Sequence, residues 1–370
     1  MQNIYPQYKP RLGTKRYKIG IVGAGDIVRN AHLPAYKKAD FPVVGIYDID
    51  IEKAKEAAKM FGLEKVYNSL ESLLEDDEVE VVDIAVPAWV QKGIVSEVVK
   101  YGKHLLCQKP LASSYADAVD IVEMAEKAGV KLAVNQQMRW DPLIASCKDL
   151  IERGWIGEPY FINFQVSINT PFETWPWLVE NDQYDLSYHS IHYFDAIRYM
   201  IGTPKYVYSS LSKYPGDTVR PETRSIVVFE YEDEKRALIS TNHRNWSDDT
   251  YATLRIEGTD GIIKGTIGLL YNYPHGRPDT LEYCSRKYYP NQWFTHIIED
   301  LWIPDAFIGT MGELQRSVEE DDTPLNSGRD NLETLQIVNA GYLSMIEKRA
   351  VSPQEIIDMK PKKPIPFSGA

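Results

Sequence analysis

Residues Gly23 to Val28 read Gly-Ala-Gly-Asp-Ile-Val and directly follow an apolar run that ends at Val22. The first glycine of such a loop permits a tight turn after a strand, and the second lets the backbone approach an anion. The unpaired N–H groups at the start of the next helix favour a phosphate. A tight turn without a ligand is the alternative, because Val28 stands where the full motif has a third glycine. We expect the loop to bind a dinucleotide through Gly23, Gly25, Asp26, Ile27 and Val28.

Asp48 ends the next apolar run, twenty residues after Val28. In dinucleotide-binding folds, an acid at this distance accepts hydrogen bonds from ribose hydroxyls, and its charge repels the 2′-phosphate of NADP. No lysine or arginine follows until Lys53. The spacing therefore predicts NAD as the cofactor, with NADP bound more weakly.

Lys109 lies in the segment Cys107-Gln108-Lys109-Pro110, at the end of a later apolar run. Ligands of open parallel sheets bind at the carboxyl ends of the strands. A lysine at such an end can meet the reactive part of a cofactor, although a Lys-Pro pair by itself is much more typical of a surface lysine.

Short apolar runs alternate with helical segments from residue 17 to 138, as expected for parallel strands joined by crossover helices. The helical periodicity of two segments ends at Gly102 and Gly129, where glycine caps are expected. The predicted strands lie within residues 17–25, 41–48, 79–87, 103–110 and 130–137, and the helices within 51–62, 89–102 and 114–129. This pattern predicts an α/β fold with an N-terminal dinucleotide-binding domain of the Rossmann type.

After Pro142 the pattern changes to long alternating strands, which predict a large, open and mostly antiparallel sheet in an α+β domain. Helices are expected near residues 142–153, 187–200, 305–320 and 329–348. The predicted division is an N-terminal arm (1–16), the Rossmann domain (17–138), the α+β domain (139–350) and a C-terminal tail (351–370).

The composition excludes several classes of partner. A formal net charge of −12 in 370 residues argues against nucleic acid and against an anionic membrane surface. The longest uncharged run, residues 159–172, contains several polar residues and is too short to span a bilayer. The N-terminus lacks the apolar core of a secretory signal, and the three cysteines are neither paired nor spaced for metal. We expect a cytoplasmic protein without a bound metal.

Several segments together resemble the glucose–fructose oxidoreductase/inositol dehydrogenase (Gfo/Idh/MocA) family. They are GIVGAGDIVRNAHLPAY, the strand ending in Asp48, DIAVPAWVQKGIVSEVVKYGKHLLCQKPLASSYADA, NQQMRWDP, IHYFDAIRYMIG and ETLQIVNAGYLSMIEKRAV. The resemblance extends from about residue 17 to residue 351. It implies an NAD(P)-binding Rossmann domain, followed by a domain whose open sheet often forms the subunit interface.

The resemblance assigns the family's catalytic lysine, from a Glu-Lys-Pro tripeptide, to Lys109. The glutamate is replaced by Gln108, which keeps hydrogen-bonding capacity but not the charge. Gln108 and Lys109 are both expected to contact the cofactor. A histidine three residues before an aspartate, on a helix that ends in glycine, faces the substrate in the family. Here these positions are His192, Asp195 and Gly202.

The aspartate that usually lies four residues before this histidine is Tyr188 here, but Asp185 and His189 have the same spacing one turn earlier. Residues three or four apart share a helix face, so His189 is expected beside His192, with Asp185 approaching the pocket. The spacing to Gly202 favours His192 as the base, and His189 is the alternative. Four side chains are expected to contact the substrate: Asp185, Tyr188, His189 and Asp195.

Two further departures concern the surroundings of the cofactor. The family's Thr-Pro is Val86-Pro87 here, and a histidine four residues after that proline is Gln91. By resemblance these residues lie near the nicotinamide. Arg139 and Trp140 open the second domain and are expected either to contact the substrate or to serve packing.

Together these observations predict an NAD-dependent oxidoreductase that acts on a secondary hydroxyl of a neutral sugar, sugar derivative or polyol. His192 would be the general base, and Lys109 would stabilise the alkoxide. The alternatives are a redox-neutral NAD-using glycosidase or epimerase, and a non-catalytic dinucleotide or sugar sensor. A homodimer or homotetramer formed through the second-domain sheet is expected.

Overall fold

The computed structural model describes residues 3–273 and 275–367. The chain forms two compact units, which are described in turn. The parallel-sheet unit comprises residues 10–140 and 303–332, and the mixed-sheet unit comprises residues up to 9, 141–302 and those from 333 onward.

The parallel-sheet unit contains a six-stranded sheet in the order β3-β2-β1-β4-β5-β6. All of its strand pairs are parallel. This order is that of the doubly wound dinucleotide-binding fold, so the predicted Rossmann architecture is confirmed. The strands are β1 (Ile19–Val22), β2 (Val43–Tyr47), β3 (Lys65–Val66), β4 (Val81–Ile84), β5 (His104–Cys107) and β6 (Leu132–Val134).

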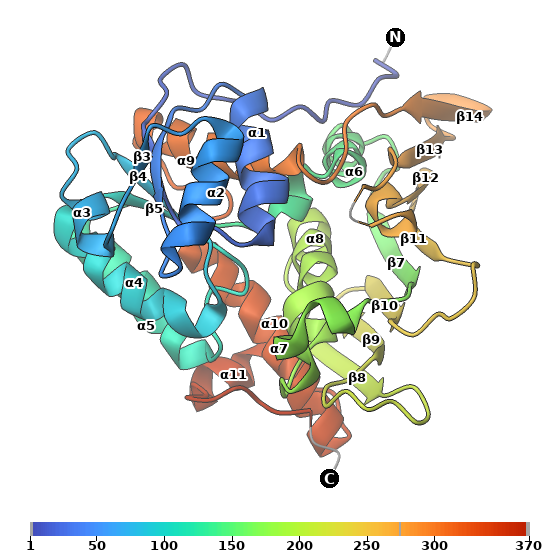
Figure 1. The fold of residues 1–370 in the computed structure, drawn as a ribbon. Helices are drawn as coiled ribbons and strands as arrows, with labels where there is room; N and C mark the ends of the chain where they lie inside the picture. Colours follow the sequence, from blue (N-terminus) through green and yellow to red (C-terminus); the bar gives the residue numbers. More distant parts are fainter. Residues whose placement is uncertain (1–2, 274, 368–370) are drawn as a thin grey trace. The chain divides into compact units, whose positions relative to one another are not determined.

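Two helical segments of this unit end at the predicted glycine caps. Gly102 and Gly129 adopt left-handed φ values of 63° and 69°, as expected for C-caps. Helices α4 and α5 contact each other and lie against β4, β5 and β6 (Figure 1). The helices are η1 (Val28–His32), α1 (Leu33–Lys38), α2 (Ile51–Phe61), α3 (Leu70–Leu74), α4 (Ala88–Val98), η2 (Val99–Tyr101), α5 (Tyr115–Ala128), η3 (Gln137–Trp140) and α9 (Ala306–Glu320).

Helix α9 belongs to the parallel-sheet unit, although it lies far along the chain within the range predicted for the second domain. Its apolar residues Phe307, Met311 and Leu314 are buried in the same core as Ile19 and Ile21 of β1. The periodicity of α9 predicts a helix but does not say which sheet its apolar face covers. The single predicted division at residue 138 therefore differs from the observed units.

The mixed-sheet unit contains an eight-stranded sheet in the order β14-β13-β12-β11-β7-β10-β9-β8 (Figure 1). Only the β7–β10 pair is parallel, so the predicted mostly antiparallel sheet is confirmed. The strands are β7 (Pro159–Ser167), β8 (Tyr206–Ser212), β9 (Arg224–Glu230), β10 (Arg236–Asn242), β11 (Tyr251–Gly258), β12 (Gly261–Thr266), β13 (Thr280–Ser285) and β14 (Tyr289–Ile297).

Helices cover one face of this sheet. In α8, Tyr193 stacks on Phe164 of β7 with ring centroids 4.9 Å apart. The remaining helices are α6 (Pro142–Glu152), η4 (Phe172–Thr174), α7 (Pro176–Val179), η5 (Asp185–His189), α8 (Ile191–Ile201), η6 (Gly268–Tyr271), α10 (Gly328–Glu347) and α11 (Pro353–Met359). Within the described residues, no helix has the length and apolarity needed to cross a bilayer.

The segment predicted as a C-terminal tail contains helix α11. A capping box formed by Ser352 and Glu355 starts this helix, and Pro353 occupies its first turn. The sequence Ser-Pro-Gln-Glu is a recognised helix-start signal that our division overlooked.

Candidate functional site

The glycine-rich loop leaves β1 at Gly23, whose φ is 109°. A Cβ atom at this position would lie 2.5 Å from the carbonyl oxygen of Ala85, so only glycine fits. A Cβ at Gly25 would instead meet no atom of the described chain within 4 Å. Gly25 thus leaves open space beside the loop, as a closely approaching pyrophosphate requires.

The rest of the loop divides between exposed residues and the core. Asp26 is exposed and Ile27 is half-buried, whereas Val28 is fully buried at the start of η1. Val28 packs in the hydrophobic core, so an apolar contact replaces the third glycine of the motif. Arg29 pairs with Asp26 at 2.7 Å and with Glu56 at 3.0 Å, so two carboxylates already engage this nearby cation.

Asp48 lies beside this loop, as its spacing predicts. Its Oδ2 accepts the N–H of Ala24 at 2.7 Å, and its Oδ1 accepts the N–H of Asp50 at 2.8 Å. Each carboxylate oxygen can accept a second hydrogen bond, and the side chain is half-buried. The carboxylate therefore anchors the loop and retains the capacity to bind ribose hydroxyls.

Lys109 follows β5, and its backbone N–H donates to Oε1 of Gln108 at 2.8 Å. Burial lowers the pKa of Lys109 to about 8. The Nε2 of Gln91 donates to the carbonyls of Gln108, Pro110 and Leu111 at 2.8, 2.9 and 3.2 Å. Gln91 is fully buried, and its hydrogen bonds hold the loop that carries Lys109.

Val86 and Pro87 lie at the carboxyl end of β4, next to the start of α4. Val86 is half-buried and Pro87 is exposed. Direct cofactor contacts from Val86, Pro87 and Gln91 stay predictions.

The sequence analysis missed a buried pair, His32 and Asp83, of which His32 lies beside Gln108. His32, in η1, places Nδ1 2.6 Å from Oδ2 of Asp83 in β4, and the hydroxyl of Tyr36 donates to the same oxygen at 2.7 Å. The Nε2 atoms of His32 and Gln108 are 3.2 Å apart. A lone aspartate inside the apolar strand Val81–Ile84 was the signal that could have revealed this cluster.

Arg139 is only 4 % exposed, and the structure favours the packing alternative for it. Its guanidinium donates to the carbonyl of Leu325 and to Oδ2 of Asp330, each at 2.5 Å. Trp140 packs on α9, where a Cβ at Gly309 would lie 2.1 Å from its ring. Substrate contacts of Arg139 and Trp140 stay a prediction.

Helix α8 carries the predicted His192 and Asp195. His192 is 6 % exposed, and its ring meets that of Trp302 edge-on, with centroids 5.2 Å apart. Asp195 is fully buried and accepts the hydroxyl of Thr334 at 2.8 Å, which gives it a structural contact within the mixed-sheet unit. Tyr188 packs edge-on against Trp177 at 5.2 Å.

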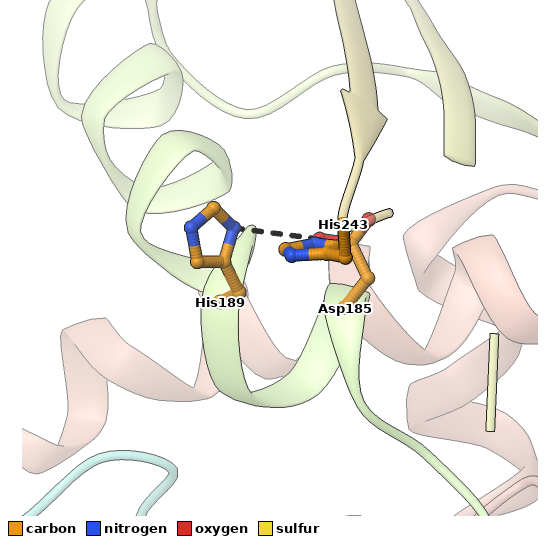
Figure 2. A group of neighbouring side chains, drawn as sticks. All are labelled: Asp185, His189 and His243. Carbon is orange, nitrogen blue, oxygen red and sulfur yellow. Dashed lines mark hydrogen bonds and ion pairs between the residues drawn. The ribbon is translucent and has the colours of Figure 1, made fainter. Parts of the chain in front are cut away.

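The predicted neighbours Asp185 and His189 come together in the π-helix η5, and a third residue, His243, joins them from the end of β10 (Figure 2). Oδ1 of Asp185 lies 3.5 Å from Nδ1 of His189 and 2.8 Å from Nε2 of His243. Ser190 and Thr241 also donate to this carboxylate, at 2.7 and 2.6 Å. The result is a buried carboxylate between two imidazoles.

Burial raises the pKa of Asp185, but the charge of His243 and the hydrogen bonds from both histidines outweigh it and hold the pKa well below its usual range. Nearby, Glu222 accepts the N–H of Leu186 at 3.2 Å and the hydroxyl of Tyr342 at 2.5 Å. Burial raises the pKa of Glu222 to about 7, and the charge of Asp185 acts in the same direction. The sequence alone gave no signal for His243 or Glu222.

Asp185, His189 and His243 are also the one group among the described residues whose ligand atoms could together hold a metal, because these atoms lie within 4.8 Å of one another. The hydrogen bonds to Asp185 already satisfy both of its oxygens. The expectation of no metal stays a prediction.

Two family models match the chain. The "Oxidoreductase family, NAD-binding Rossmann fold" model matches residues 17–136, and the Gfo/Idh/MocA C-terminal domain model matches residues 144–264. The chain therefore belongs to the Gfo/Idh/MocA family of oxidoreductases, as the resemblance implied. Its Rossmann unit is of the NAD-binding class, and the open space at Gly25 and the position of Asp48 fit that cofactor.

Characterised relatives extend over nearly the whole chain. D-apiose dehydrogenase from Paraburkholderia graminis is 28 % identical over 96 % of this chain and 95 % of its own length. Myo-inositol 2-dehydrogenase from Thermotoga maritima is 23 % identical over 92 % of this chain and 99 % of its own.

Solved structures share the fold. Levoglucosan dehydrogenase in complex with NADH and levoglucosan has a TM-score of 0.78 and 21 % identity, covering 91 % of this chain and 99 % of its own. An oxidoreductase from Agrobacterium radiobacter, in complex with NAD⁺, L-tartaric acid and magnesium, has a TM-score of 0.81 and 22 % identity, covering 92 % of this chain and all of its own.

Proposed function

We propose that the protein is an NAD-dependent dehydrogenase that oxidises a secondary hydroxyl of a neutral sugar, sugar derivative or polyol, or reduces the corresponding carbonyl. The observation that carries the proposal is the dinucleotide loop, with open space at Gly25 and Asp48 anchored beside it. Three of the relatives named above are dehydrogenases of D-apiose, myo-inositol and levoglucosan, which are polyhydroxylated and uncharged. The fourth, from Agrobacterium radiobacter, was crystallised with L-tartaric acid, which is anionic at neutral pH.

In this proposal, His192 accepts the proton of the substrate hydroxyl, since imidazole titrates near neutral pH. The ammonium group of Lys109 donates a hydrogen bond to the oxygen as it becomes an alkoxide. A lysine with a pKa of about 8 is mostly charged at pH 7 and can still exchange its proton. NAD, when bound, supplies the hydride acceptor.

His189 is a second candidate for the base, and a specific observation favours it. Its Nδ1 lies 3.5 Å from the buried carboxylate of Asp185, and a carboxylate on one imidazole nitrogen orients the ring and stabilises its protonated form. His192 has the spacing of the family's histidine, whereas His189 has the carboxylate partner.

An anionic substrate would require arginines that are available to bind it. The arginines considered for this role already pair with carboxylates, which supports a neutral substrate. Arg139 pairs with Asp330 at 2.5 Å, and Arg244 binds both oxygens of Asp217 at 2.8 Å. Arg198 is buried beside a carboxylate one turn earlier on its own helix. These guanidinium groups already have carboxylate partners, so a phosphate or uronate would have to displace one of them.

The test is a panel of aldoses, polyols and anhydrosugars, each paired with its phosphate or uronate, incubated with NAD or NADP. We expect reduced cofactor to form fastest with NAD and a neutral member. A preference for the anion in kcat/KM by more than about tenfold, equal to 1.4 kcal/mol, contradicts the neutral substrate.

The same panel separates the alternatives. A redox-neutral enzyme would convert a sugar without net formation of NADH, which chromatography of the sugar detects. A sensor would bind NAD or a sugar in calorimetry and convert neither.

We also propose that the protein forms a homodimer or homotetramer through the outer face of the eight-stranded sheet. This face exposes Tyr206 and Tyr208 of β8 and Ile226 and Val228 of β9, and apolar patches of this kind mark interfaces. Light scattering after size exclusion tests the proposal. A monomeric wild type, or a Val228→Glu variant that assembles as the wild type does, argues against it.

A further inference from the structure

Four residues of the parallel-sheet unit form a continuous hydrogen-bond chain that ends at Lys109. Asp83 Oδ2 lies 2.6 Å from His32 Nδ1, and His32 Nε2 lies 3.2 Å from Gln108 Nε2. Gln108 Oε1 then accepts the backbone N–H of Lys109 at 2.8 Å. The chain thus connects β4, the helix that follows the dinucleotide loop, and the end of β5.

The direction of every hydrogen bond in this chain follows from its last member. The backbone N–H of Lys109 can only donate, so the atom of Gln108 that faces it must be the oxygen. The amide nitrogen of Gln108 therefore faces His32, and its N–H donates to Nε2 of the imidazole. The amide of Asn135 approaches the same nitrogen at 3.3 Å, also as a donor. His32 consequently carries its proton on Nδ1, where it donates to Asp83.

We propose that Asp83, His32 and Gln108 act as a positioning relay for Lys109, and that the amide at position 108 keeps His32 a neutral imidazole with its proton on Nδ1. The role in turnover rests on the proposed function, because Lys109 is its proposed oxyanion-stabilising group. His32 and Asp83 are fully buried, so no solvent competes for these hydrogen bonds.

The amide nitrogen of Gln108 sets the protonation state of His32, whereas its oxygen holds the backbone of Lys109. A glutamate at position 108 would keep an oxygen for the N–H of Lys109 but would turn its other oxygen towards Nε2 of His32. Two acceptors would then face the two ring nitrogens, and His32 would take up a second proton. Among the described residues, the carboxyl of Asp83 and the hydroxyl of Tyr36 are the titratable groups seen to contact this ring. Burial and the charge of Asp83 raise the pKa of the Cys107 thiol.

The first test reads the tautomer directly and needs no activity. Protein labelled with ¹⁵N-histidine is studied by long-range ¹H–¹⁵N NMR at pH 7, and loss of a signal in His32→Leu assigns the residue. We expect the neutral Nδ1–H form in the wild type and the doubly protonated form in Gln108→Glu. Asn68→Asp adds a charge on the exposed surface of the same unit and should leave the His32 signal unchanged. A wild-type His32 protonated on Nε2, or a signal that Gln108→Glu does not move, overturns the relay.

The second test separates positioning from binding. Gln108→Leu removes the acceptor for Lys109, so we expect kcat to fall by about tenfold to a hundredfold, the usual effect of misplacing a catalytic group. The Kd for NAD, measured by calorimetry, should change less than about threefold. Gln108→Glu, which keeps the acceptor oxygen, should recover most of the lost kcat. Equal losses in Gln108→Leu and Gln108→Glu overturn the positioning role.

The two tests fail independently. A wild type that reduces NAD with no sugar overturns the proposed function, and the NMR experiment then still decides whether the relay exists. An active wild type whose kcat is unaffected by Gln108→Leu overturns the relay's role in turnover while the proposed function stands.

Discussion

Oδ2 of Asp48 accepts the backbone N–H of Ala24 at 2.7 Å, which ties the acid that ends β2 to the loop that follows β1. The other carboxylate oxygen accepts the N–H of Asp50 at the start of α2. Asp48 thus has two tasks in one position: it fixes the loop and presents a negative charge beside it. A substitution of Asp48 should affect both the loop and the charge. The ratio of the affinities for NAD and NADP isolates the effect of the charge.

We predict that Asp48→Ala narrows the preference for NAD over NADP by about 1 to 3 kcal/mol, the value of a hydrogen bond to a charged group. The loss of repulsion towards a 2′-phosphate acts in the same direction. Calorimetric titration of both cofactors into wild type and variant gives the ratio of the two Kd values. Asp77→Ala removes an exposed charge from the same unit and should leave this ratio unchanged. Equal affinities for NAD and NADP in the wild type contradict the assignment.

Lys109→Ala should lower kcat by about 10² to 10⁴ while NAD still binds, as expected for loss of an acid–base or oxyanion-stabilising group. Because the charged form is the proposed active one, the wild-type kcat should fall as the pH rises through the pKa of about 8. Lys109→Arg stays charged and should extend activity to higher pH. Lys127→Ala, on the exposed face of α5, is the matched control. If kcat falls over the same pH range in Lys109→Arg as in the wild type, a group other than Lys109 causes the loss of activity at high pH.

The features that sequence predicted correctly arise from local signals. The strand–loop–helix at Gly23, the spacing to Asp48 and the glycine caps at Gly102 and Gly129 each depend on a short stretch of chain. The Asp-x-x-x-His spacing likewise pointed to Asp185 and His189, which lie 3.5 Å apart, whereas the expected position of His189 beside His192 stays a prediction.

The features that sequence missed arise from contacts between distant segments. His32 and Asp83 meet only because η1 and β4 are brought together in the folded unit, and His243 reaches Asp185 from a strand 58 residues further along the chain. Periodicity likewise located α9 without revealing which sheet it covers. The ion pair of Arg139 likewise depends on a distant partner, because Asp330 lies 191 residues further along the chain.

The two candidate bases can be separated by His192→Asn and His189→Asn. If His192 is the base, His192→Asn should lose about 10² to 10⁴ in kcat and His189→Asn much less. The reverse order would assign the base to His189 and make Asp185→Asn comparably damaging. Steady-state kinetics with the best substrate of the panel decides between them. His275→Asn, at an exposed position of the same unit, is the control.

Removing metal should not affect activity. The carboxylate of Asp185 is satisfied by Ser190, Thr241 and His243, and the other ring nitrogen of His243 lies 2.9 Å from the hydroxyl of Thr170. These contacts give both oxygens of Asp185 and both ring nitrogens of His243 a hydrogen-bond partner without an ion. We expect dialysis against EDTA to leave kcat unchanged and elemental analysis to find substoichiometric metal. One metal per chain, with activity lost on chelation and restored by the metal, would reverse this prediction.

Glu222→Gln should flatten the dependence of stability on pH. The pKa of Glu222 is raised from 4.5 to about 7, chiefly by burial, so the folded state holds the proton more tightly than the unfolded state. Its contribution is therefore fully present below pH 4.5 and is lost as the pH rises through 7. The shift corresponds to a contribution on the order of 3 kcal/mol to the free energy of unfolding. Urea unfolding between pH 5 and about 8 measures it.

Glutamine resembles the protonated carboxyl, because its amide oxygen can still accept the N–H of Leu186 and the hydroxyl of Tyr342. The free energy of unfolding of the variant should therefore match that of the wild type near pH 5 and exceed it above pH 7. Glu234→Gln removes one charge at an exposed position of the same unit. Its free energy of unfolding should depend on pH as that of the wild type does. If Glu222→Gln is less stable than the wild type at pH 8, the ionised carboxylate stabilises the turn at Leu186, and its pKa is not raised.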